Sequence, residues 1–394
     1  MRCTCCDSSH LFDVLCLEGV PVFCNVLCAS VEDARAFPRH DIRLVMCRDC
    51  GHLFNAAFDP IQVEYSGTYE NALHFSGVFR EYQARLIDEL VDRDGVRGKH
   101  IVELGCGDAS FLSALCEKGE NTGIGYDPAF DPVRATIPNP DRVSVRRELF
   151  TPATAAGQRI DVVCCRHVLE HIDTPRTWLR GVRDSVSRAT RPEDALLFFE
   201  VPNAAYMLRE LAIWDLIYEH CNYFTPRAMA RAFQRAGFRV DRTDEVYSGQ
   251  FLALRAHLAP ANVPAAIESR TPEDESNEAM AHQFGSACRE KISLWRSRFD
   301  GWAKAGKRVV LWGAGTKGVM LLNLADADQA AVGVVDLNPR KHGHFIAGTG
   351  QPILSPGGLT DVMPDVVVVV NPVYEAEIRR DLASHGLSPE VVLA

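Results

Sequence analysis

The stretch WDLIYEHCNYF, from Trp214 to Phe224, places side chains that could do chemistry among large apolar residues. Tyr218, Glu219 and His220 supply a phenol, a carboxylate and an imidazole in succession. The stretch is compatible with a metal site, with acid/base machinery, or with a core whose polar groups are satisfied. A catalytic metal is disfavoured because no H-x-x-x-H or carboxylate spacing accompanies His220. On a regular helix Glu219 would point roughly 100° away from His220, so only a turn would bring both into one pocket.

Four cysteines near the N-terminus have the spacing of zinc ligands. Cys3 and Cys6 form one C-x-x-C pair, and Cys47 and Cys50 form another, which is followed by a glycine that permits a tight turn. Two such pairs can place four thiolates around Zn²⁺ at about 2.3 Å each. A closed four-thiolate site leaves no position for substrate, so zinc would support folding and not catalysis. Unliganded thiols are the alternative, and the quartet could instead draw on Cys5, Cys16, Cys24 or Cys28.

A glycine-rich turn in the middle of the chain predicts a nucleotide-type cofactor. KHIVELGCGDASFLSALCEKG reads as a strand, a turn with Gly105 and Gly107, and an amphipathic helix, and Asp127 ends the next strand, where it can accept hydrogen bonds from ribose hydroxyls. The third glycine of a dinucleotide fingerprint is missing, because position 110 is serine. Glu103, just before the glycines, suits the cationic amino-acid end of S-adenosylmethionine better than a diphosphate.

A later strand, RIDVVCCRHVLEHIDTP, supports the same choice of cofactor. It ends in Arg166 and His167, followed by LEH, a pattern typical of class I methyltransferases, and both residues are assigned to the cofactor site. His167 and His171 have the i, i+4 spacing of a metal pair. That interpretation is disfavoured because His167 falls at the strand end, where cofactor contact is expected.

The last third of the chain repeats the strand, glycine loop and helix pattern. After a polar, proline-bearing linker and a helix, KRVVLWGAGTKGVMLLNL carries a complete G-x-G-x-x-G at Gly313, Gly315 and Gly318, and Asp336 ends the following strand. Alone, this is a moderate signal for NAD. Only one more clear strand, DVVVVVNP, follows, so at most half of a dinucleotide fold is predicted.

Composition limits the class of protein. A chain of 394 residues predicts two or three domains. The formal charge of -10 disfavours nucleic acid as a partner, because phosphate contacts demand clustered Lys and Arg. The sequence contains no apolar run of membrane-spanning length and no signal-peptide pattern, which predicts a cytoplasmic protein without a membrane partner.

Together these pieces resemble the S-adenosylmethionine-dependent sugar C-methyltransferases that act on nucleotide-linked keto-deoxysugars. The chain departs from the pattern in the extra Cys5 and in Ala109, which stands where many methyltransferases have a third glycine. The matching stretches cover nearly the whole chain: the cysteine pairs, GHLFNAAFDP, YENALHFS, VELGCGDASFL, CRHVLEHI, FFEVPN, IWDLIYEHCNYF, LWGAGTKGVMLLN and VVDLNP.

The resemblance implies an α/β protein in three parts: a zinc-binding module over 1–70, a class I methyltransferase Rossmann-like core over 71–260, and a helical linker with a C-terminal half-Rossmann domain over 261–394. It also implies that the C-terminal module carries no nicotinamide. A structural role, or contact of Lys317 and the loop amides with a sugar-nucleotide diphosphate, is preferred there. The substrate is expected between the core and its flanking modules, in contact with Tyr69, Asn71, His74, Phe75, Asn203 and Lys317. An ordinary linker and helix start is the alternative for the first four.

The implied reaction is methylation of a ring carbon next to a ketone, at C-3 of a dTDP-4-keto sugar, in deoxysugar and natural-product biosynthesis. It needs a base that removes a C–H proton and leaves an enolate. Tyr218, Glu219 and His220 match the family's catalytic region. His220 is the first choice of base, because an imidazole with a pKa of about 6.5 suits proton transfer at neutral pH. Tyr218 is its partner or substitute.

Other functions remain open. O- or N-methylation of a sugar or small metabolite would look the same in sequence. A non-catalytic zinc and nucleotide-binding scaffold would need no His220. A zinc-bearing RNA methyltransferase is disfavoured by the net charge. The chain is expected to be a monomer.

Overall fold

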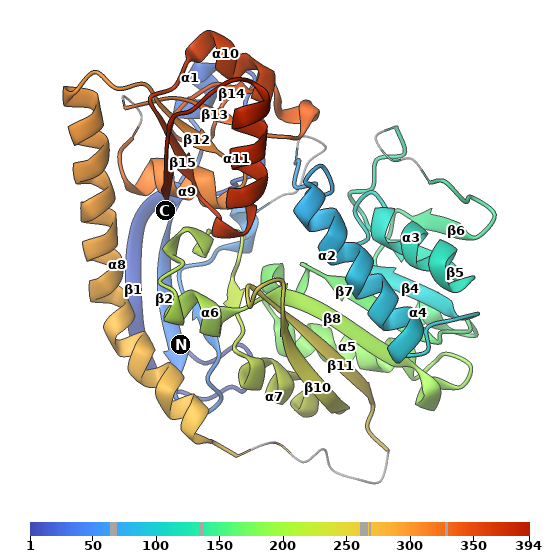
Figure 1. Ribbon diagram of the computed structural model, residues 1–394. Coiled ribbons are helices and arrows are strands. Elements are labelled where there is room, and N and C mark those ends of the chain that lie inside the picture. The colour runs from blue at the N-terminus through green and yellow to red at the C-terminus, as the bar shows by residue number, and fades with distance from the viewer. Residues whose placement is uncertain (64–68, 134, 136, 261–266, 268, 328–329) are drawn as a thin grey trace.

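The computed structural model describes residues 1–63, 69–133, 135, 137–260, 267, 269–327 and 330–394. The main strands of these residues form three sheets, and Figure 1 shows them in blue, in cyan to olive, and in orange to red. Much of the predicted linker, residues 261–266 and 268, lies outside the described residues.

The N-terminal sheet is antiparallel and has the strand order β1-β2-β3-β9. Its last strand comes from far along the chain, since Leu53 pairs with Tyr223 and Phe54 with Asn222. This sheet therefore includes part of the stretch that contains His220. Its elements are β1 (Leu11–Pro21), α1 (Val31–Arg35), β2 (Arg39–Cys47), β3 (Leu53–Asn55) and β9 (Asn222–Tyr223).

The middle sheet has the strand order β10-β11-β8-β7-β4-β5-β6. Strands β4 to β8 are parallel, and β11 is antiparallel to both of its neighbours. Helices cover both faces, with α2 and α3 on one and α4, α5 and α7 on the other (Figure 1). The predicted Rossmann-like α/β core is confirmed. The strands are β4 (His100–Leu104), β5 (Thr122–Tyr126), β6 (Val143–Arg146), β7 (Val162–Arg166), β8 (Leu196–Pro202), β10 (Phe238–Val246) and β11 (Phe251–Leu258). The helices are α2 (Gly77–Asp88), α3 (Ser110–Gly119), α4 (Pro152–Ala155), α5 (Pro175–Val186), α6 (Ala204–Arg209) and α7 (Pro226–Ala236).

The C-terminal sheet is parallel and has the order β14-β13-β12-β15-β16. It has two strands more than the sequence pattern predicts. Strand β14 is too short, and β16 too exposed, to leave a clear apolar run. The elements are β12 (Val309–Trp312), α9 (Thr316–Leu324), β13 (Ala331–Val335), β14 (Ile353–Leu354), α10 (Leu359–Val362), β15 (Val366–Val369), α11 (Glu375–Ser384) and β16 (Glu390–Leu393).

Helix α8 (Pro272–Lys304) runs along β1 and on to the C-terminal module (Figure 1). A glycine permits the close packing, because a Cβ at Gly285 would lie 2.3 Å from the main-chain oxygen of Val14. Phe284 and Trp295 on α8 belong to an apolar cluster that also contains Leu311 of β12. One core thus joins the first and last modules. Among the helices of the described residues, none combines the length and the apolarity that a membrane span requires.

A buried ion pair fixes the start of α8. Arg231 on α7 donates from two nitrogens to the two carboxylate oxygens of Asp274, each at 2.7 Å, and also to the main-chain oxygen of Cys50. We expect Asp274→Ala to destabilise the protein by about 3–5 kcal/mol in chemical denaturation, because it leaves a guanidinium buried without its carboxylate. Asp92→Ala, which breaks an exposed pair with Arg97, should change stability by less than about 1 kcal/mol. Equal effects of the two would contradict this prediction.

Candidate active site

The glycine turn after β4 is shaped for close approach of a ligand. Gly105 and Gly107 both have positive φ angles, which L-residues with a side chain rarely adopt. A Cβ at Gly105 would lie 2.4 Å from Val168, whereas one at Gly107 would meet no atom within 4 Å. The outer side of Gly107 is therefore open, and a ligand can lie directly against its main chain.

Two acidic residues flank this turn as the sequence predicts. Asp127 follows β5 and accepts from the N–H groups of Gly107 (2.8 Å) and Ala129 (2.9 Å), which leaves lone pairs for ribose hydroxyls. Glu103 is 3% exposed, and within the described chain its Oε2 has no hydrogen-bond partner. Burial raises the pKa of Glu103 to about 8. A buried carboxyl with an unsatisfied oxygen fits a cationic ligand group.

Arg166 and His167 lie at the end of β7, where both approach a carboxylate that the sequence argument did not single out. Arg166 donates to Glu200 at 2.9 and 3.2 Å and stacks over the ring of Phe111. His167 Nε2 lies 2.9 Å from the same carboxylate. The guanidinium of Arg166 is thus engaged within the protein, which leaves less of it for a cofactor than the sequence predicts.

His220 lies at the end of a tight turn. Its N–H donates to the main-chain oxygen of Ile217, and its ring meets that of His171 edge-on at 4.8 Å between centroids. Within the described part of the chain, no group hydrogen-bonds to the His220 imidazole. Burial holds the pKa of His220 well below 6.5, and the nearby charges of His171, His167 and Lys317 add to this effect. The ring is therefore neutral, and its nitrogens make no hydrogen bond within the described chain.

Tyr218 and Glu219 point away from His220, toward the N-terminal sheet. The Tyr218 hydroxyl accepts from the N–H of Asp59 at 2.9 Å, and its ring lies between those of His40 and Phe58. The Glu219 carboxylate accepts from the N–H of Cys24 at 2.8 Å and from the hydroxyl of Tyr69 at 2.7 Å. The segment is a turn, as the sequence allowed, but it does not bring the predicted trio together.

His171 belongs to the site and was not among the predicted catalytic residues. Its Nδ1 lies 3.0 Å from the main-chain oxygen of Glu219, which can only accept, so Nδ1 carries the proton. One carboxylate oxygen of Glu170 and one ring nitrogen each of His171 and His220 all lie within 4.8 Å of one another. The LEH motif contains the signal, but the sequence pattern presents His171 only as the second member of a metal pair, and the strand-end position favours His167.

The predicted substrate residues divide into two groups. Tyr69 contacts Glu219, His74 lies 3.7 Å from Asp108 in the glycine turn and stacks on Phe75, and Asn71 is exposed. Tyr69 is thus linked to the stretch that carries Glu219, and His74 lies beside the glycine turn. In contrast, both ends of the Asn203 amide are engaged, since it caps α6 and donates to the main-chain oxygen of Gly249.

Lys317 connects the C-terminal module to the stretch that carries His220. Its ammonium pairs with Asp215, five residues before His220. In the adjacent glycine loop Asp336 accepts from the N–H of Ala314 at 2.9 Å, and the buried Lys341 donates to the oxygen of Ala314. Lys341 thus lies against the glycine loop of the C-terminal module.

The four predicted cysteine ligands converge on one point. Cys3 and Cys50 have sulfurs 3.6 Å apart, as do Cys6 and Cys47, and all four sulfurs lie within 4.8 Å of one another. A tetrahedron with Zn–S bonds of 2.3 Å has edges of about 3.8 Å, so the spacing fits zinc. The possible substitutes Cys5, Cys16, Cys24 and Cys28 do not belong to this cluster.

Asn222 joins the cysteine cluster region to the histidines. Its carbonyl oxygen lies 3.0 Å from Nε2 of the buried His52, two residues after Cys50. Its amide nitrogen donates to the main-chain oxygen of Ile172, next to His171, at 2.6 Å. Because Asn222 also belongs to β9, the zinc-type module directly supports the turn that carries His220.

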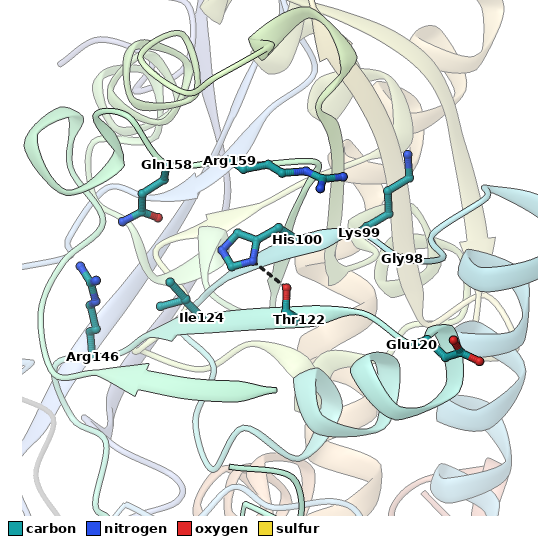
Figure 2. Close-up of a pocket in the computed structure, with 9 residues that line it drawn as sticks. All are labelled: Gly98, Lys99, His100, Glu120, Thr122, Ile124, Arg146, Gln158 and Arg159. Atoms are coloured by element: carbon teal, nitrogen blue, oxygen red, sulfur yellow. Dashed lines mark hydrogen bonds between the residues drawn. The ribbon is translucent and has the colours of Figure 1, made fainter. Parts of the chain in front are cut away.

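A surface hollow of about 550 Å³ lies elsewhere. Its lining includes His100 and Thr122, the first residues of β4 and β5, which hydrogen-bond to each other, and Arg159 (Figure 2). Ligands of open α/β sheets bind outside the carboxyl ends of the strands. Most of this hollow's lining comes from the amino ends of the strands and the loops before them, with Arg146 at the end of β6, and none of it belongs to the site described above.

Comparison with known proteins decides the family. A methyltransferase domain model matches residues 76–243, and a C-methyltransferase C-terminal domain model matches residues 259–386. The C-methyltransferase NovU of Streptomyces niveus is 25% identical over 393 residues, which cover 96% of this chain and 91% of that protein. The chain belongs to the S-adenosylmethionine-dependent C-methyltransferases.

Other similarities to this C-methyltransferase cover less of the chain. A ubiquinone biosynthesis O-methyltransferase of Methylobacterium sp. (strain 4-46) is 28% identical over 191 residues, which are 43% of this chain and 74% of that protein. The solved structure of CalO1, a methyltransferase in calicheamicin biosynthesis, is 19% identical with a TM-score of 0.36 over 48% of this chain and 57% of its own. These likenesses are confined to less than half of the C-methyltransferase.

The residues around the glycine turn of the C-methyltransferase fit S-adenosylmethionine. Gly107 provides an open main chain, Asp127 provides acceptors, and Glu103 provides the unsatisfied buried carboxyl. We expect Asp127→Ala to weaken binding of S-adenosylhomocysteine by roughly 10- to 150-fold in calorimetry, through loss of a hydrogen bond to an ionised acceptor worth about 1.5–3 kcal/mol. Asp127→Asn, which keeps one acceptor oxygen, should lose less. Undiminished affinity in the alanine variant would contradict the assignment.

Proposed function

We propose that this C-methyltransferase methylates a ring carbon next to the ketone of a nucleotide-linked keto-deoxysugar, with C-3 of a dTDP-4-keto sugar as the first candidate. The observation that supports it best is His220, a neutral imidazole without a hydrogen-bond partner in the described chain, held beside His171. A carbon next to a ketone becomes a nucleophile only after a base removes its proton. A hydroxyl oxygen already has lone pairs, so O-methylation depends less on such a base.

When bound, S-adenosylmethionine supplies an electrophilic methyl group on a sulfonium. Glu103, Gly105, Gly107 and Asp127 would hold it at the carboxyl ends of β4 and β5. His220 accepts the proton from the carbon next to the ketone, and the C–H electron pair becomes the double bond of an enolate. The enolate carbon then forms the C–C bond as the S–C bond breaks. His171, with its tautomer set by Glu219, positions the His220 ring.

The flanking modules have supporting roles in this proposal. One zinc ion, held by Cys3, Cys6, Cys47 and Cys50, stabilises the sheet that contains β9. Tyr69, Asn71, His74 and Phe75 cover the sugar from the N-terminal side, and Lys317 with the loop amides at the start of α9 faces the diphosphate.

Product analysis tests the proposed function. The enzyme is offered dTDP-, UDP- and GDP-linked keto-sugars with S-adenosylmethionine that carries a ¹³C-methyl group, and NMR locates the new methyl. A methyl on the carbon next to the ketone is the expected result. A methyl on oxygen or nitrogen would replace the proposal with the alternative reaction. Absence of turnover on every keto-sugar would overturn the substrate class.

A further inference from the structure

His167 has an unusual backbone and a paired environment. Its φ angle is +55°, a left-handed conformation that is unfavourable for a residue with a side chain. The main-chain N–H donates to the oxygen of Glu200 at 2.8 Å, and Nε2 lies 2.9 Å from the Glu200 carboxylate. Two contacts to one residue therefore keep His167 in a conformation that it would not adopt by itself.

The carboxylate behind His167 is built to stay ionised. Glu200 is 0% exposed and also accepts from Arg166 and from the hydroxyl of Tyr82 on α2. Burial alone would raise the pKa of Glu200, but Arg166 and His167 lower it to about 2. A second buried carboxylate, Glu170, lies 3.5 Å from His167 Nδ1. His167 thus has an acidic group near each of its ring nitrogens.

One ring nitrogen of His167 remains available to a ligand. Nε2 is shielded from solvent and meets Glu200 as a charge contact without hydrogen-bond geometry, while the side chain as a whole is 27% exposed. The other nitrogen, Nδ1, is too far from Glu170 for a strong hydrogen bond. The Glu170 carboxylate in turn lies within 4.8 Å of a ring nitrogen of His171 and of His220. The Nδ1 side of His167 is thus linked through Glu170 to the histidine cluster.

We propose that His167 is a catalytic imidazolium that donates a hydrogen bond from Nδ1–H to the carbonyl oxygen of the substrate, and that Glu200 positions it. When His220 takes the carbon-bound proton, the carbonyl π electrons move to that oxygen, and the imidazolium balances the developing charge without giving up its proton. On formation of the C–C bond the electrons return and the ketone is restored. This role rests on the enolate reaction proposed above.

The two histidines divide the work because their environments differ. Burial alone would lower the pKa of His167, but Glu170 and Glu200 raise it to about 9, so its ring is charged at neutral pH. His220 has cations for neighbours and is neutral. When the environments of two titratable side chains shift their pKa values in opposite directions, one can act as the acid and the other as the base. The earlier expectation placed His167 on the cofactor, so the two assignments can be tested against each other.

Two substitutions suit the left-handed backbone at position 167. His167→Asn keeps that conformation and an N–H donor but removes the charge, and His167→Gly removes the side chain. Loss of one preorganised donor should lower the methylation rate by about 10²–10³ in the glycine variant, and by less in the asparagine variant. Binding of S-adenosylhomocysteine should stay within about threefold. Arg191→Gly makes the same backbone change at an exposed left-handed residue and should retain the wild-type rate.

Hydrogen exchange on the substrate separates the possible outcomes. A keto-sugar deuterated next to the ketone should lose its label with saturating S-adenosylhomocysteine in the wild type, and both His167 variants should slow this loss in proportion to methylation. Unchanged exchange with weakened S-adenosylhomocysteine binding would overturn the oxyanion role in favour of cofactor binding. No exchange by the wild type on any keto-sugar would overturn the enolate reaction and this role with it.

NMR titration provides a readout that needs no substrate. The groups around His167 are the charged Arg166, Glu170 and Glu200 and the neutral imidazole of His220, and His171 lies beside Glu170 and His220. The His167 ring should stay protonated up to about pH 9, and Glu200→Gln should move its titration toward 6.5. If Glu200→Gln misfolds, Glu170→Gln provides the same comparison. A wild-type His167 that titrates at or below 6.5 would overturn the proposal whatever the substrate.

Discussion

Replacing His220 with alanine should lower the methylation rate by about 10²–10⁴ and leave S-adenosylhomocysteine and sugar binding nearly intact. The proposed base accepts a proton only when neutral. Because the pKa of His220 is held well below 6.5, the neutral form dominates at pH 6.5 and above. The rate should therefore fall on the acid side only well below pH 6.5, and on the alkaline side near pH 9, as His167 loses its proton.

Exchange of substrate deuterium identifies the base directly. The wild type should exchange the label when S-adenosylhomocysteine replaces the methyl donor, and His220→Ala should not. His100→Ala, in the hollow of Figure 2, is a matched control and should keep the wild-type rate within about threefold. Exchange at the wild-type rate in His220→Ala would move the base to His171, whose protonated Nδ1 leaves Nε2 as the basic atom of the neutral ring.

Cys47→Ser should lose the zinc and destabilise the N-terminal sheet by several kcal/mol. Structural zinc contributes about 10–16 kcal/mol of apparent binding energy in small zinc modules, and three thiolates hold it much less well than four. Elemental analysis should fall from about one zinc per chain to near zero, and the melting temperature should drop. The methylation rate should fall as well, because Asn222 lies between His52 and the turn that carries His171.

The matched control for the zinc prediction is Cys16→Ser. Cys16 is an exposed cysteine on β1 outside the cluster, so this variant should keep its zinc and its melting temperature. Full zinc in Cys47→Ser would exclude the proposed ligand set.

Local spacing predicts the parts of this protein that depend on neighbours in sequence. The Cys3 and Cys47 pairs, the turn at Gly105 and the acidic ends of β4 and β5 are patterns of a few residues, and the structure has all of them. The directions of Tyr218 and Glu219 were not predictable in this way. Their partners, Asp59 and Cys24, lie 159 and 195 residues away in sequence, so only the tertiary fold determines where those side chains point.

Glu200 shows a similar limit. In sequence it is one acidic residue in an apolar strand, FFEVP, and a buried carboxylate there is unfavourable unless it is paired. Its partners come from β7 and α2, which only the sheet order brings together. The sequence therefore shows that an acidic residue interrupts an apolar strand, but only the structure shows which side chains pair with it.

The pairing of β3 with β9 determines how relatives of this enzyme can be recombined. A chimera cut only near residue 70 would place a foreign first module against the native strand Asn222–Tyr223, and with it foreign partners for Glu219 and Asn222. Residues 1–70 should therefore be exchanged together with 213–224, and with the C-terminal module that shares their core and pairs Lys317 with Asp215. Chimeras that exchange all of these segments should keep activity, while those that exchange the first alone should fold poorly and lose it.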